Sequence, residues 1–166
     1  MRTVIYTLTV IATCSLYALI AEETKTETDA SLQTRRDKLR IGAQKICPVS
    51  GNKLGPDAVK VRIGKQTMFL CCKECSRGKV DPIHWKTVHA NFARAQGICP
   101  VMKQKLPAKP KYTIVNGQLF YVCCPPCTAK IEDEPEVYLA KLDQLHAAAL
   151  STIAVAGKAK SESNDE

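Results

Sequence analysis

The alternation of apolar and polar residues predicts two short hairpins in the middle of the chain. Residues 112–115 and 118–122 are apolar runs that flank Asn116-Gly117, a dipeptide that favours a two-residue β-turn. Earlier in the chain, residues 59–63 alternate between apolar and basic side chains, as in a half-buried strand. A Gly-Lys turn then leads into the apolar run 66–70. We therefore expect two antiparallel hairpins.

A helix is expected after each hairpin. Asp81 can cap a helix that begins at Pro82 and ends before Gly97, because Pro suits the first helical position and Gly the end. A second, longer helix is expected to begin at Pro135 and to run to about residue 156. The apolar residues of the first helix that should face the hairpin are Trp85, Val88 and Phe92.

The N-terminal segment has the pattern of a secretory signal peptide. An apolar run over residues 4–20 follows Arg2 and stops at Ala21, just before two glutamates. We expect residues 1–21 to be removed on export to the periplasm or the extracellular space. The alternatives are a retained membrane anchor and a lipid attached to Cys14.

The segments that flank the hairpins and helices are polar. Residues 22–42 are rich in Thr, Glu, Lys and Arg, and we expect a linker or a marginal helix there. Residues 148–166 are expected to hold the end of the last helix and a disordered tail.

The net charge of +8 is concentrated in the middle of the chain. Between Arg35 and Lys130 there are 19 basic and 4 acidic residues. The lysines are scattered, and an exported protein seldom meets nucleic acid, so nucleic acid is not an expected partner. A membrane partner is expected only if the N-terminal apolar segment is retained.

The cysteines reveal a tandem repeat. Four cysteines recur together 52 residues later, and the sequences Ile-Cys-Pro-Val and Lys-Leu recur with them. Two copies are too few to form a stacked array, so each copy, residues 43–96 and 97–147, is expected to stabilise itself. The repeated cysteines are Cys47, Cys71, Cys72 and Cys75 in the first copy and Cys99, Cys123, Cys124 and Cys127 in the second.

Four cysteines in so small a module indicate a metal site. Below roughly 70 residues a hydrophobic core rarely stabilises a fold alone, and metals or disulfides are the usual supplement. Zn²⁺ prefers thiolate and imidazole ligands in a tetrahedron. Cys72 and Cys75 have the spacing of a zinc knuckle, and Cys47 can return to the same point across the hairpin. We therefore expect Zn²⁺, with Cu⁺ or another soft metal as the alternative.

The ligand set within each copy stays open. Successive side chains on a strand point to opposite faces, so Cys71 and Cys72 cannot easily bind one ion unless the chain has turned. The site could use Cys47, Cys75 and one of the adjacent pair, with a fourth ligand from elsewhere. Because the second copy has only His146, which is not at an equivalent place, a ligand set common to both copies must come from cysteine. The candidate extra ligands in the first copy are His84 and His89.

These motifs resemble the TRASH and YHS domains. The likeness is carried by Cys-Pro-Val, a hairpin, Phe-Leu-Cys-Cys-Lys-Glu-Cys or Tyr-Val-Cys-Cys-Pro-Pro-Cys, and then an acidic residue and Pro before a helix. It covers residues 45–145 as two copies and implies a treble-clef-like or zinc-ribbon fold with a role in heavy-metal sensing, trafficking or resistance. The cysteines that match the family's motif are Cys47, Cys71 and Cys75, and Cys99, Cys123 and Cys127.

The sequence therefore predicts an α+β protein of two small tandem modules, each with a β-hairpin, a Cys-Cys-x-x-Cys knuckle and a helix, in a zinc-ribbon or treble-clef-like arrangement. It is expected to bind metal without catalysis, with a metal transporter or chaperone as a candidate partner. One alternative is a disulfide-stapled extracellular domain, since the mature cysteines are even in number. Another is a thiol–disulfide oxidoreductase, although the hairpins do not supply the βαβ context of that chemistry.

Overall fold

The computed structural model describes residues 29–162 and the side chains of residues 29–152. The expected signal peptide, Cys14 and the last four residues lie outside this range. The contacts divide the chain into two units, Met1–Asp37 and Lys38–Glu166, and both hairpins and all eight repeated cysteines belong to the second. Residues 29–44 are helical, so the described part of the expected linker is a helix.

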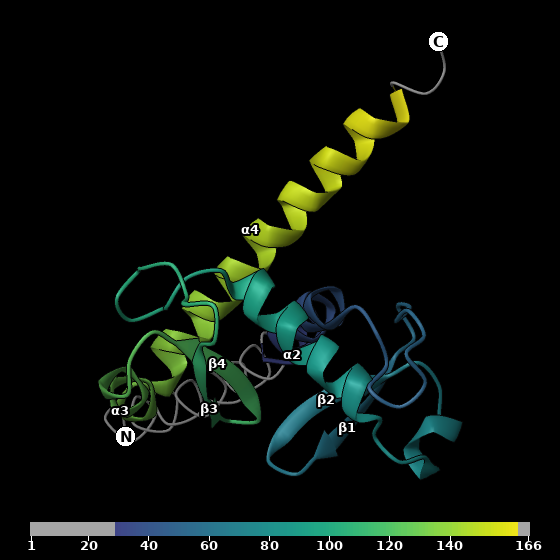
Figure 1. Cartoon of the computed structure of the whole chain (residues 1–166), viewed down its shortest axis with the longest axis horizontal. Helices are drawn as coiled ribbons and strands as arrows, with labels where there is room; N and C mark the ends of the chain where they lie inside the picture. Colours follow the sequence, from purple (N-terminus) through teal and green to yellow (C-terminus); the bar gives the residue numbers. More distant parts are fainter. Residues whose placement is uncertain (1–28, 163–166) are drawn as a thin grey trace, which may run out of the picture. The chain divides into compact units, whose positions relative to one another are not determined.

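Both hairpins form at the expected places (Figure 1). The first pairs β1 (Val59–Ile63) with β2 (Gln66–Leu70), and the second pairs β3 (Lys111–Val115) with β4 (Gln118–Val122). In the second turn Asn116 and Gly117 both have positive φ, of 50° and 77°, as a type I′ turn requires. The hairpins also touch, because the backbone N–H of Thr67 donates to the carbonyl of Gly117 at 2.7 Å.

The helix after the first hairpin confirms the expected boundaries. α2 (Pro82–Gln96) begins with the Asp81 carboxylate accepting from the backbone N–H groups of the first turn, and Gly97 follows it with φ of 68°. A proline at the start and a glycine in the left-handed conformation at the end delimit the helix from both sides.

The second copy has one helix that the sequence pattern did not reveal. α3 (Pro126–Asp133) follows its last cysteines, where the first copy has only the short 3₁₀ turn η1 (Glu74–Arg77). α4 (Pro135–Glu162) then begins as expected but continues past Gly157. The expected end near residue 156 was wrong, because a single glycine in a helix rich in Ala and Lys costs only about 1 kcal/mol. None of the helices within residues 29–162 is long and apolar enough to cross a membrane.

The two copies share part of their hydrophobic core. Met68 of β2 and Val88 and Phe92 of α2 share one cluster with Leu119 and Tyr121 of β4. α2 packs against β4 and against α4, so the helix of the first copy covers part of the second. The expectation that each copy stabilises itself stays a prediction, and the structure adds that the two copies bury apolar side chains against one another. Each hairpin is too small to bury both faces, and the copies cover one another.

Candidate metal centre

The first cysteine of each copy lies in a tight turn that the two copies share. Ile46 forms an isolated bridge with Lys53, and the backbone N–H of Gly51 donates to the carbonyl of Cys47 at 2.9 Å. Cys47 is fully buried. In the second copy Ile98 and Lys105 form the same bridge, around the fully buried Cys99.

The remaining cysteines of the first copy gather just after β2. That strand ends at Leu70, so the alternation of a strand no longer separates Cys71 from Cys72, and their Sγ atoms lie 3.8 Å apart. Cys75 stands in η1, with its Sγ 3.6 Å from Cys71 and 3.5 Å from Cys72. Cys47, Cys71 and Cys75 bring their sulfur atoms within 4.8 Å of one another.

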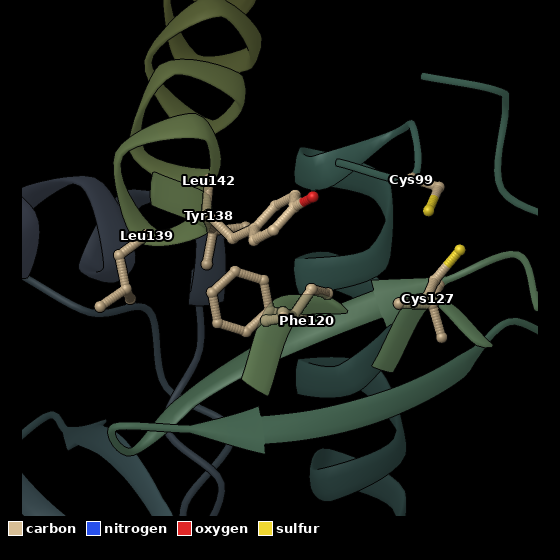
Figure 2. Close-up of a cluster of buried hydrophobic side chains, with 8 residues drawn as sticks. Cys99, Phe120, Cys127, Tyr138, Leu139 and Leu142 are labelled. Carbon is tan, nitrogen blue, oxygen red and sulfur yellow. The ribbon is translucent and has the colours of Figure 1, made fainter. Parts of the chain in front are cut away.

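The second copy repeats this arrangement with a more buried last cysteine. The Sγ atoms of Cys99, Cys123 and Cys127 lie within 4.8 Å of one another. Cys124 Sγ is 3.8 Å from Cys123 and 3.0 Å from Cys127, which is buried. Figure 2 shows the sulfurs of Cys99 and Cys127 facing each other beside a cluster of buried apolar side chains.

These separations suit a shared ion. A tetrahedral Zn²⁺ with Zn–S bonds of about 2.3 Å holds its sulfurs roughly 3.8 Å apart. All eight cysteines of the two clusters are free thiols. Sulfurs from two segments about 24 residues apart thus converge at the spacing of a thiolate–metal site, twice in the chain. Within the part of the chain that the structure describes, these two cysteine triads are the groups that could hold a metal ion.

The turn around the first cysteine favours its thiolate. Burial by itself would raise the pKa of Cys47, but hydrogen bonds, led by the one from the Ser50 backbone, outweigh burial and lower the pKa to about 6. The pKa of Cys99 is lowered by the same balance, with the Met102 backbone as the leading donor. A backbone N–H that points at sulfur stabilises negative charge there, which prepares the first ligand of each copy.

The last cysteine of each copy shows the opposite shift. The neighbouring Cys72 sulfur, followed by burial, raises the pKa of Cys75 to about 12. Burial, followed by the Cys124 sulfur, raises the pKa of Cys127. Clustered thiols resist losing all their protons in the absence of a cation, so metal binding here would release protons.

Two buried glutamines, which the sequence analysis missed, join the segments of each cluster. Gln44 donates to the carbonyls of Ile46 and Phe69 at 3.0 and 2.7 Å, and its Oε1 accepts from the Phe69 N–H at 2.9 Å. Ile46 precedes Cys47, and Phe69 lies two residues before Cys71. Gln44 therefore ties the first cysteine to the later ones.

Gln96 makes the same three hydrogen bonds in the second copy. It donates to the carbonyls of Ile98 and Tyr121 at 2.9 and 2.6 Å and accepts from the Tyr121 N–H at 2.9 Å. We call the contacts of Gln44 and Gln96 the glutamine clasps. The sequence contains a sign of this equivalence, because Ala43-Gln44 recurs as Ala95-Gln96 at the same 52-residue spacing as the cysteines.

His84 braces the turn of the first copy and does not join the sulfurs. Its Nδ1 is 3.2 Å from the Val49 carbonyl and 3.9 Å from the Asp81 carboxylate. Its ring lies so close to Gly51 that a Cβ there would be 2.5 Å from Nε2. The histidine thus supports the turn that carries Cys47.

His89 lies between the two copies. Its Nδ1 is 3.0 Å from the hydroxyl of Tyr121, which donates to the His89 carbonyl, and its ring contacts Trp85 and Tyr112 at centroid distances of 5.0 and 5.2 Å. Burial lowers the pKa of His89. The described structure groups neither His89 nor His84 with the cysteines.

Comparison of the chain with protein-family models, curated proteins and solved structures found no match.

Proposed function

We propose that the protein binds one soft metal ion in each copy and serves in metal trafficking, sequestration or resistance, without catalysis. The observation that carries the proposal is the convergence of sulfurs from separate segments to within 4.8 Å, repeated in both copies. Soft thiolates select Zn²⁺ and Cu⁺ over harder ions. Cys72 and Cys124 are the proposed fourth ligands, because each sulfur lies within 3.8 Å of two others in its cluster. Neither belongs to the triads whose sulfurs all lie within 4.8 Å of one another, so their ligation requires a small shift toward the first cysteine.

Charge supports the same proposal. Four thiolates around a divalent ion leave a net charge of −2 in each copy, which is unfavourable unless cations lie near. The segment that contains both clusters is strongly basic, with 19 basic and 4 acidic residues between Arg35 and Lys130. This excess of positive charge offsets the two sites without any need for a nucleic-acid partner.

The proposal extends to the type of fold, the location of the protein and its partner. A hairpin followed by a cysteine knuckle and a helix supports a treble-clef-like or zinc-ribbon arrangement of the TRASH and YHS kind. The apolar segment before Glu22 supports export, to a compartment where a metal transporter or chaperone is the proposed partner. An exported form that begins near Glu22, identified by N-terminal mass spectrometry, would support this location. Retention of the full chain in the cytoplasm would contradict it.

The test is metal analysis of the chain purified anaerobically under reducing conditions. We expect close to two ions per chain, loss of folded structure on chelation, and thiolate charge-transfer absorption after Co²⁺ replacement. The double variant Cys47→Ser, Cys99→Ser should lose both ions. The matched control is Ser76→Ala, at an exposed position beside Cys75 whose hydroxyl contacts only the Lys73 carbonyl.

Two outcomes would overturn the proposal. One is a folded chain with all eight thiols free and no bound metal. The other is four disulfide bridges in the protein isolated from its own compartment, which would favour the disulfide-stapled alternative.

A further inference from the structure

The turn after the first cysteine differs in chemistry between the two copies. The first copy has Ser50-Gly51, and the second has Met102-Lys103. The backbone is the same in both, because Gly51 and Lys103 each donate an N–H to the carbonyl of the first cysteine, at 2.9 and 2.8 Å, and both have positive φ. Ser50 and Met102 therefore leave the backbone at equivalent places.

Ser50 contacts a ligand sulfur directly. Its Oγ lies 3.2 Å from Cys71 Sγ, and the same oxygen accepts from the Asn52 N–H at 3.3 Å. Because the oxygen serves as acceptor toward Asn52, its proton is available to a Cys71 thiolate. A hydrogen bond to a ligating sulfur withdraws electron density from it, and such outer contacts tune the affinity of a site.

Met102 offers a different chemistry at the equivalent place. Its side chain has no proton to donate to sulfur, and this flexible side chain is 49% exposed, so it is not packed in the core. A thioether is a soft neutral donor of the type that selects Cu⁺. The second turn therefore offers its cluster no side-chain hydroxyl and carries a thioether at the place from which Ser50 reaches a ligand sulfur in the first copy.

We propose that the two sites prefer different cations, and that residues 50 and 102 set the difference. The first site favours Zn²⁺, and the second takes Cu⁺ more readily, with Met102 as an additional soft donor. This inference rests on the proposed function, since it assumes that both clusters bind metal. It adds that the duplication produced two chemically distinct sites.

The experiment titrates Cu⁺ anaerobically into the full chain loaded with two Zn²⁺ ions. Native mass spectrometry follows the mixed species with one ion of each kind, and a competing Cu⁺ chelator sets the free Cu⁺ concentration. We expect the two Zn²⁺ ions to leave at free Cu⁺ concentrations at least tenfold apart. The ¹³Cε signal of Met102 should shift with the first equivalent, while that of the buried Met68 stays unchanged as an internal reference.

Reciprocal variants then assign the preference to these positions. Ser50 and Met102 are both exposed, so their exchange should leave the fold intact. Met102→Ser should bring the two displacement steps within about threefold of each other, and the double exchange Ser50→Met, Met102→Ser should reverse their order. Met102→Leu keeps the apolar bulk and removes the sulfur, and Ser50→Ala removes the hydroxyl alone.

The possible outcomes separate the two proposals. Two bound Zn²⁺ ions that leave together, or a Met102 signal that ignores Cu⁺ while Met102→Leu behaves as wild type, would overturn the inference and leave the proposed function in place. A wild-type chain that binds no metal would contradict the proposed function itself.

Discussion

The two copies hold the same four cysteines in the same turns but bury them in cores of different size. In the first copy, Cys47 clusters with three other buried residues. In the second, Cys99 and Cys127 belong to a cluster of eight buried residues that includes Phe120 and the first turns of α4 (Figure 2). Every residue of β4 is buried, whereas β2 has one that is only half-buried. From this difference in burial we expect the two copies to depend to different degrees on the metal that we propose for them.

The largest expected effect is unequal loss of structure when metal is removed. Structural zinc contributes on the order of 10 kcal/mol to the folding of small modules, and the first site has fewer buried apolar residues around its cysteines to replace that contribution. On stepwise chelation, amide exchange should accelerate in β1 and β2 before β3 and β4. Cys47→Ser should reproduce the loss in the first hairpin with one ion left per chain. Simultaneous loss in both hairpins would show that the difference in core size has no consequence.

The next effect concerns the glutamine clasps. Gln44→Met keeps the side-chain volume but leaves buried groups of Ile46 and Phe69 without partners, which should cost about 2–4 kcal/mol in the free energy of unfolding. It should also weaken metal binding at the first site at least tenfold, and Gln96→Met should do the same at the second. Measurements are denaturant unfolding and Co²⁺ competition.

A matched control for the clasps lies in β2. Gln66 is also buried, but its Oε1 has no hydrogen-bond partner, so Gln66→Met should be neutral or stabilising. If Gln66→Met weakens metal binding as much as Gln44→Met does, the clasps have no special role in positioning the cysteines.

A further difference between the copies is a buried histidine, His146, that only the second copy has. Burial, helped by the charge of Arg40, lowers the pKa of His146 to about 4, from 6.5 in the unfolded chain. Between these values the unfolded chain binds the proton and the folded chain does not, so stability falls as the pH falls from 6.5 to 4. His146→Leu should remove this loss, giving a variant that gains about 3 kcal/mol relative to wild type at pH 4. A difference in the free energy of unfolding that does not change with pH would contradict this assignment.

The smallest effects lie at two backbone positions where the copies exchange glycine and lysine. Residues 45 and 97, and residues 51 and 103, all have positive φ, but the first copy has Lys45 and Gly51, and the second has Gly97 and Lys103. A left-handed conformation costs a lysine about 1 kcal/mol. Lys45→Gly and Lys103→Gly should each stabilise by about 0.5–1 kcal/mol in thermal unfolding, whereas Gly97→Ala should destabilise by a similar amount.

Local signals in the sequence were sufficient to predict both hairpins, the bounds of α2, the start of α4 and the gathering of the cysteines, but not α3 or the end of α4. Asn116-Gly117 marks a turn and Asp81-Pro82 a helix start by their own chemistry, and the 52-residue spacing reveals the repeat. The ligand geometry could not be predicted, because the alternation of a strand gives no information about Cys71 and Cys72 once the strand has ended at Leu70.

The contacts between segments that are distant in the sequence could not be predicted from such local signals. Gln44 and Gln96 are polar residues at the ends of helices, where a solvated side chain is the usual expectation. Their burial depends on unpaired backbone groups of strands 25 residues further along the chain. The core that the two copies share could not be predicted either, because hydrophobic spacing shows which face of α2 is apolar but not which hairpin covers that face.

α2 has a further consequence for how the chain can be divided. Its start is held on the first turn by the Asp81 N–H, which donates to the Pro48 carbonyl, and its last residue is Gln96, the clasp of the second site. This single helix of 15 residues is therefore the last element of the first copy and carries the residue that ties together the cysteine segments of the second. If the chain were divided between the two copies, the second copy would lose Gln96, and the apolar face of α2 in the first copy would be exposed. Adding a third copy after the second would require that α4 end in Ala-Gln, as α2 does, so that a glutamine could join the cysteine segments of the new copy.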